Sequence, residues 1–114
     1  MTHITEEMIE KAYEIYFTDD RDISPLVEMG MNETSANMTM VWFSKLFGGE
    51  LYKRSGSAMQ IEWILNKLYS TYDFKRLALS IESLKLYCDY YDKRSDSKVR
   101  RLVNTYEKML EEAL

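Results

Sequence analysis

Apolar residues recur three or four positions apart along almost the whole chain, in segments separated by short polar, glycine or proline runs. This spacing places apolar side chains on one face of an α-helix, whereas a half-buried strand needs strict alternation. The sequence contains no such alternation and no internal repeat. The pattern therefore predicts an all-α fold, a compact bundle of about five helices plus one short helix.

Residues that start or stop helices set the predicted boundaries. Polar residues whose side chains can cap a helix precede the periodic segments. Ser24-Pro25 has a cap followed by a first-turn proline, and Gly30 and Gly48-Gly49 stand where helices end. The caps are Thr5, Ser24, Asn32, Ser57 or Ser55, Asp73, and Ser95 or Ser97.

The periodic residues also predict which faces are buried. In the first helix these are Met8, Ile9, Ala12, Tyr13 and Tyr16. Between about residues 57 and 72 they are Met59, Trp63 or Ile64, Leu68 and Tyr72, and after Asp73 they are Leu77, Ile81, Leu84 and Cys88. In the last helix they are Val99, Leu102, Tyr106, Met109 and Ala113, a heptad-like spacing sustained for about two repeats.

At 114 residues the chain is long enough to bury a core, and we expect residues 1–114 to form a single helical domain. Cys88 is the only cysteine, so the chain cannot form an internal disulfide and nothing indicates secretion. No signal-peptide pattern and no apolar run of about 20 residues is present. We expect a cytoplasmic protein that does not contact a membrane.

Charge is unevenly distributed along the chain. Residues 1–34 carry nine acids against two cations, whereas residues 35–101 carry twelve Lys and Arg against seven acids. Two differently charged surfaces would explain this asymmetry, and charged helix faces that only contact water would explain it equally well.

The sequence offers few residues for catalysis. His3 is the only histidine, so a zinc site of the usual ligand count and a histidine-activated nucleophile are both excluded. Gly48-Gly49 lacks the spacing of a phosphate-binding loop. We therefore expect a protein that is not an enzyme, with no catalytic residue, metal site or cofactor.

Two groups of cations between predicted helices are the candidate binding residues. The first is Tyr52-Lys53-Arg54, and the second lies within residues 93–101. Lysine and arginine beside serine and a helix start suit contact with phosphate or an acidic partner, although a charged turn without a ligand has the same composition. The second group comprises Lys93, Arg94, Lys98, Arg100 and Arg101.

Three tyrosines precede the second group of cations. Helical spacing places Tyr87 and Tyr91 on the same face as Leu84, so we expect these two rings in the core rather than stacked on nucleic-acid bases. Tyr90 is the third tyrosine of this segment.

Three motifs occur in a fixed order: GMNETSA at residues 30–36, GELYKRSGSA at 49–58 and LKLYCDYY at 84–91. Over about residues 23–110 the chain thereby resembles a helical accessory module that is fused to HNH-type restriction endonucleases in bacteria. The module has a histidine and an aliphatic residue where this chain has Tyr87 and Cys88. The single histidine cannot form an HNH site, so the resemblance implies the module without its nuclease half. It also implies that Lys53 and Arg54 face a backbone phosphate or an acidic partner.

Three functions remain open. The chain is a small inhibitor, encoded by a phage or mobile element, that binds a restriction or CRISPR nuclease; or it is a nucleic-acid-binding module that acts beside a separate endonuclease; or it is a structural homodimer held through the 97–113 helix. A net charge of −4 disfavours general nucleic-acid binding, because affinity scales with the number of phosphates neutralised. We therefore expect a protein partner, such as a DNA-targeting nuclease or its complex, ahead of DNA.

Overall fold

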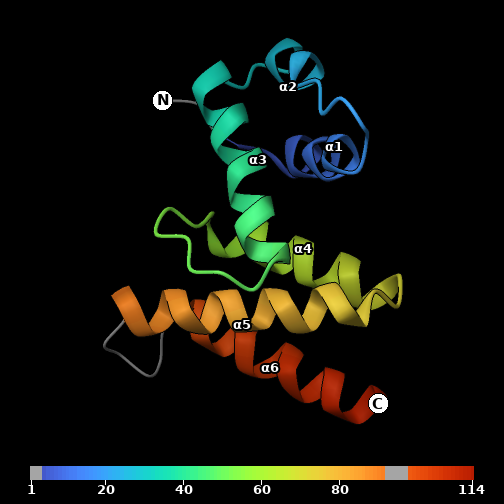
Figure 1. Cartoon of the computed structure of the whole chain (residues 1–114), viewed down its shortest axis with the longest axis vertical. Coiled ribbons are helices and arrows are strands. Elements are labelled where there is room, and N and C mark those ends of the chain that lie inside the picture. The colour runs from blue at the N-terminus through green and yellow to red at the C-terminus, as the bar shows by residue number, and fades with distance from the viewer. Residues whose placement is uncertain (1–3, 92–97) are drawn as a thin grey trace. The chain divides into compact units, whose positions relative to one another are not determined.

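The computed structural model describes residues 4–91 and 98–114, and these residues form helices and no strand. Five longer helices and one short helix confirm the all-α prediction (Figure 1). No helix in these two ranges is both long and apolar enough to span a membrane. The helices are α1 (Glu6–Tyr16), α2 (Ser24–Glu28), α3 (Glu33–Phe47), α4 (Ala58–Ser70), α5 (Phe74–Tyr91) and α6 (Lys98–Ala113).

The chain divides into two compact units, Met1–Phe43 and Ser44–Leu114, and the boundary falls inside α3. The first unit holds α1, α2 and most of α3, and the second holds the end of α3 together with α4, α5 and α6. That residues 1–114 form a single domain stays a prediction.

The predicted caps of α1 and α3 are confirmed in the first unit. Thr5 Oγ1 accepts a hydrogen bond from the Met8 N–H at 3.2 Å, and Asn32 Oδ1 accepts one from the Thr34 N–H at 2.8 Å. Each bond satisfies a backbone donor that has no partner within its own helix, which fixes where that helix begins.

The start of α2 differs from the prediction, because Ser24 is the first helical residue and Ile23 is the cap. The backbone N–H and hydroxyl of Ser24 both donate to Asp22 Oδ1, at 3.0 and 2.7 Å. These hydrogen bonds favour the ionised carboxylate and lower the pKa of Asp22 below its ordinary value. Asp22, rather than Ser24, therefore supplies the side-chain acceptor before α2.

Helix α1 buries Met8, Ile9 and Ala12 as predicted, but Ile15 completes its apolar face. The predicted residues Tyr13 and Tyr16 are only half-buried. Further core residues of this unit are Leu26, Met31, Ala36, Trp42 and Phe43.

In the second unit α4, α5 and α6 pack pairwise against one another (Figure 1). All four residues predicted on the inner face of α5 are buried, and so is Leu68 of α4. The buried residues of these three helices include Ile61, Ile64, Leu65 and Leu68; Leu77, Ile81, Leu84 and Cys88; and Val103, Tyr106 and Leu110.

Two predicted faces are only partly correct. On α4, Ile64 and Leu68 are buried as predicted, but Met59 and Tyr72 are exposed and Trp63 is half-buried. The buried stripe continues through Ile61 and Leu65 instead. On α6, the heptad-like face that was predicted to hold a homodimer together contributes only Tyr106 to the core. The helix instead buries its other apolar stripe, which contains Val103 and Leu110. Of that face, Val99, Leu102 and Met109 are half-buried and Ala113 is exposed.

Candidate functional site

The segment between α3 and α4 begins with a tightly bonded turn. The Glu50 N–H donates to the Lys45 carbonyl at 2.9 Å, and the Gly49 N–H donates to the Leu46 carbonyl at 3.3 Å. This pair of bonds closes the last turn of α3 and needs a left-handed residue, which Gly49 supplies with a φ of 72°. The end of α3 therefore sets the direction in which the following loop leaves.

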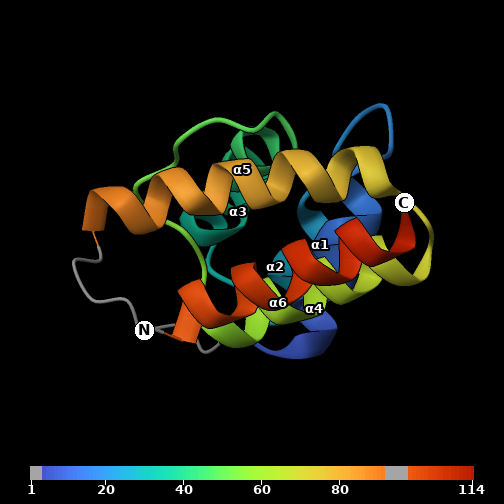
Figure 2. The ribbon, with the colours of Figure 1, turned by 90° about the horizontal axis from the view of Figure 1, so that it is seen from below.

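The same turn rests on α5. A Cβ atom at Gly49 would lie 3.1 Å from Leu79 Cδ2, closer than side chains normally approach. Next to it, the buried Ser83 hydroxyl donates to the Glu50 carbonyl at 2.5 Å, while the Glu50 carboxylate pairs with Lys45 at 3.4 Å. Both ribbon views draw the loop alongside α5 (Figures 1 and 2). Glycine at residue 49 and serine at residue 83 thus fasten the loop to this helix.

The other end of the loop is fixed by the cap of α4. Ser57 Oγ accepts a hydrogen bond from the Gln60 N–H at 3.4 Å, and Gln60 Oε1 accepts one from the Ser57 N–H at 3.1 Å. This reciprocal capping box confirms Ser57, one of the two predicted caps. The residues between Glu50 and Ser57 are therefore held at both ends.

The first group of candidate residues lies on this loop. Lys53 and Arg54 are exposed, and Tyr52 is half-buried. Lys53 Nζ lies 4.6 Å from the centre of the Tyr90 ring on α5, within the range of a cation–π interaction. No described residue forms a hydrogen bond or ion pair with Arg54. The charge of Arg54 is therefore not balanced by an ion pair with any described residue.

The second group is only partly covered by the structure. Lys93 and Arg94 lie outside the described residues. Lys98, Arg100 and Arg101 occupy the first turn of α6. Lys98 and Arg101 are exposed, and Arg100 is half-buried.

Arg100 links the start of α6 to the end of α5, because its Nη2 atom lies 3.4 Å from Asp89 Oδ1. Asp89 directly precedes Tyr90, the residue that Lys53 contacts. The structure therefore brings one cation from each predicted group to the last turns of α5. For Arg100 the contact is an ion pair within the fold.

The tyrosines at this end of α5 correct one prediction. Tyr91 is not in the core: its exposed fraction is 52%, and that of Tyr90 is 51%. The Tyr91 ring lies 4.7 Å from the Tyr90 ring and 5.3 Å from the half-buried Tyr87 ring, measured between centroids. Tyr91 turns outward because Leu84 and Cys88 already fill the inner face of the helix here. We call Lys53, Arg54, Tyr90 and Tyr91 the tyrosine–cation surface.

Lys85 is a further cation of α5, and it is already committed to an ion pair. Its ammonium group contacts the Glu107 carboxylate of α6, and this hydrogen bond raises the pKa of Lys85 above its ordinary value. The pair ties two helices together and is separate from the tyrosine–cation surface.

Within residues 4–91 and 98–114, no group of three or more His, Cys, Asp or Glu side chains could hold a metal ion. Cys88 is buried in the core of the second unit, as its place on the predicted inner face of the helix after Asp73 indicated.

Comparisons with protein-family models, with curated proteins and with solved structures found no match.

Proposed function

We propose that this chain is a non-catalytic binding protein and that its tyrosine–cation surface contacts a protein partner. The observation that carries the proposal is the pair of half-exposed rings, Tyr90 and Tyr91, beside two exposed cations on an anchored loop. Tyrosine and arginine are enriched among the residues that dominate protein–protein affinity. A loop held at both ends also loses less conformational entropy on binding.

The arrangement of the rings favours a protein over nucleic-acid bases at this surface. Lys53 lies over the Tyr90 ring, and Tyr91 lies against Tyr90 in an edge-to-face arrangement. These contacts occupy part of the ring surface on which a base would stack, while protein side chains can use the remaining edges and hydroxyl groups. Lys53 and Arg54 favour a partner whose contact surface is acidic.

The kind of partner follows from the resemblance of residues 23–110 to a module of restriction endonucleases. We propose a DNA-targeting nuclease of the restriction or CRISPR type, with this chain acting as an inhibitor from a phage or another mobile element. An inhibitor needs a recognition surface and no catalytic group of its own. Nucleic acid bound directly at Lys53 and Arg54 is the second candidate, because both cations are exposed.

The test combines binding with inhibition. Purified restriction and CRISPR nucleases would be assayed for affinity to this protein by interferometry, and for plasmid cleavage in its presence. Lys53→Glu/Arg54→Glu should weaken binding at least thirtyfold, the scale of a hot spot, and restore cleavage. The melting temperature should fall by only a few degrees, since losing the contact of Lys53 with Tyr90 costs about 0.5–1 kcal/mol and an exposed charge reversal at Arg54 about half a kcal/mol or less.

Lys108→Glu provides the matched control, because this cation is exposed on α6 and belongs to neither candidate group. It should bind and inhibit like the unaltered protein. A correctly folded double variant that still binds would remove the tyrosine–cation surface from the site. If no nuclease binds but a DNA duplex does, with a shallower salt dependence in the double variant, the second candidate is correct.

A further inference from the structure

The turn between α4 and α5 contains a residue that the fold does not explain. Tyr72 has a φ of 59°, a left-handed conformation that favours glycine, and its exposed fraction is 80%. The Asp73 N–H donates to the Leu68 carbonyl at 2.9 Å and the Tyr72 N–H to the Tyr69 carbonyl at 3.1 Å, the same bonding that Gly49 completes at the end of α3. A bulky, exposed side chain thus occupies a glycine position.

In the described part of the chain, Arg21 is the one other non-glycine residue with a positive φ, which is 46°. Contacts of its side chain compensate for this strained backbone conformation. Arg21 Nε donates to the Tyr16 carbonyl at 2.9 Å, and its guanidinium lies 4.1 Å from the centre of the Tyr16 ring. The arginine therefore caps α1. Among the described residues, the one ring or polar contact of the Tyr72 side chain is edge-to-face with Phe74, with centroids 6.0 Å apart. Backbone strain that no such contact compensates is common at functional positions.

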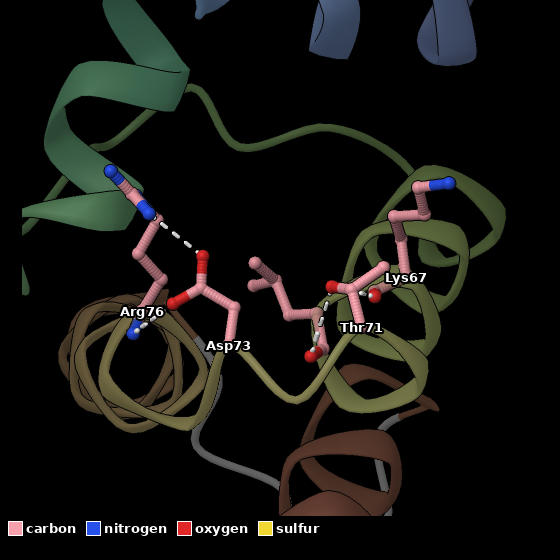
Figure 3. Close-up of polar contacts among 5 residues, drawn as sticks. Lys67, Thr71, Asp73 and Arg76 are labelled. Carbon is pink, nitrogen blue, oxygen red and sulfur yellow. Dashed lines mark hydrogen bonds and ion pairs between the residues drawn. The ribbon is translucent and has the colours of Figure 1, made fainter.

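Cations surround this turn. Lys67 lies near the end of α4, and Lys75 and Arg76 lie in the first turn of α5. Asp73 accepts from Arg76 Nη1 at 2.7 Å, so the charges of these two residues offset each other. The side chains of Lys67 and Arg76 extend to the same side of the turn (Figure 3). Lys67 and Lys75, on the two helices that flank the exposed ring, form no ion pair with a described residue.

We propose that Lys67, Tyr72 and Lys75, which we call the Tyr72 corner, bind single-stranded nucleic acid. One base would stack on the ring of Tyr72, and the adjoining phosphates would lie beside the cations. Such sites combine an aromatic platform with positive charge and tolerate any sequence, because every base has a π-face. A duplex offers no unstacked base for such a ring.

The ring contacts separate this corner from the tyrosine–cation surface. Tyr90 has Lys53 over its ring and Tyr91 against it, whereas Tyr72 has one edge contact and most of its surface in solvent. The two sites lie at opposite ends of α5, whose 18 residues span about 27 Å at 1.5 Å per residue. Either site can therefore be altered without touching the other, and the two proposals fail independently.

The test measures fluorescence anisotropy of a labelled 15-nucleotide oligothymidylate at low salt. Tyr72→Gly removes the ring and relieves the backbone strain, so it should melt at a higher temperature yet bind about tenfold more weakly. Tyr72→Phe keeps the ring and should bind like the unaltered protein. Tyr72→Asn, which tolerates the same backbone conformation, should reproduce the loss without the added flexibility of glycine.

Two further measurements separate stacking from charge. Lys75→Gln should reduce the slope of log affinity against log salt by about 0.7, the value for one phosphate contact on a single strand. Inorganic polyphosphate, a polyanion without bases, should bind the unaltered protein and Tyr72→Gly equally. The proposal is overturned if the oligonucleotide does not bind, if duplex DNA of the same length binds as tightly, or if Tyr72→Gly binds without loss. In the last case the exposed ring would serve a protein contact.

Discussion

Replacing Gly49 by alanine tests how the loop between α3 and α4 is fastened to α5. The substitution places a Cβ on a residue whose φ is 72°, which costs about 1–2 kcal/mol in the left-handed region. The new methyl group would also lie 3.1 Å from Leu79 Cδ2, so Leu79 must shift by a few tenths of an ångström. Crowding of this kind costs about 1 kcal/mol at its lower end. The free energy of unfolding should therefore fall by about 2–3 kcal/mol.

The steric part can be isolated with Leu79→Ala. That variant removes the atom the new methyl group would meet, while the strain of the backbone at residue 49 remains. In this background Gly49→Ala should cost only about 1–2 kcal/mol, which leaves a coupling energy of about 1 kcal/mol between the two positions.

Urea unfolding followed by far-ultraviolet circular dichroism measures all four members of this cycle. The midpoint should shift without a change in the m-value if only native stability changes. A loss below about 0.5 kcal/mol for Gly49→Ala, within the usual range for neutral surface changes, would refute the required left-handed turn. An equal loss in the two backgrounds would refute the close approach of the loop to α5.

Alkaline pH should weaken the second unit. Burial, with a smaller effect of Glu62, raises the pKa of Tyr106, so the unfolded chain loses this proton at a lower pH than the folded protein does. The stability that the protonated Tyr106 contributes is therefore complete below about pH 10, the ordinary pKa of tyrosine, and is lost as the pH rises through the folded pKa. The raised pKa of Lys85 acts in the same direction. Between pH 9 and 11 the free energy of unfolding, measured with urea, should therefore decline less steeply in Tyr106→Phe but should still decline. An equally steep decline in the variant would contradict the role of Tyr106. Trp42 and Trp63 lie in different units, so Trp63→Phe and Trp42→Phe leave one fluorescent reporter in each. A single domain over residues 1–114 predicts that fluorescence and circular dichroism midpoints coincide in both variants, and separate midpoints would contradict it.

Helix boundaries were predictable because their signals are local. Asn32 and Ser57 cap the helices that follow them, and Gly49 completes the turn after α3. Each signal involves residues no more than about five positions apart, so the sequence order itself brings the groups together. Tyr72 shows the limit of this reasoning, because a tyrosine gives no warning that a helix ends in a glycine-like conformation.

Buried faces and site contacts were harder to predict because they depend on neighbouring helices. On α6 two apolar stripes compete, and packing against α4 and α5 selects Val103 and Leu110 over the heptad-like residues. Exposure of Lys53 and Arg54 agrees with their place between helices, but the contact from Lys53 to Tyr90 joins residues 37 positions apart. Paired tyrosines directly before the second group of cations were the sequence signal that could have indicated Tyr90 and Tyr91 as exposed.

Lys53 and Arg54 are adjacent and exposed, yet their surroundings predict different consequences of mutation. Lys53 lies over the Tyr90 ring, an interaction worth about 0.5–1 kcal/mol at an exposed site, whereas no described residue bonds to Arg54. Lys53→Glu should therefore lower both stability and partner binding, and Tyr90→Leu should reproduce its loss of stability.

Arg54→Glu should leave the melting temperature unchanged and still weaken binding, because its charge is available only to a partner. Melting curves and affinities measured on the same preparations separate these effects. If Arg54→Glu lowers the melting temperature while Lys53→Glu does not, the roles of the two cations are reversed. The loop would then depend on Arg54 for its attachment, and Lys53 would become the cation offered to the partner.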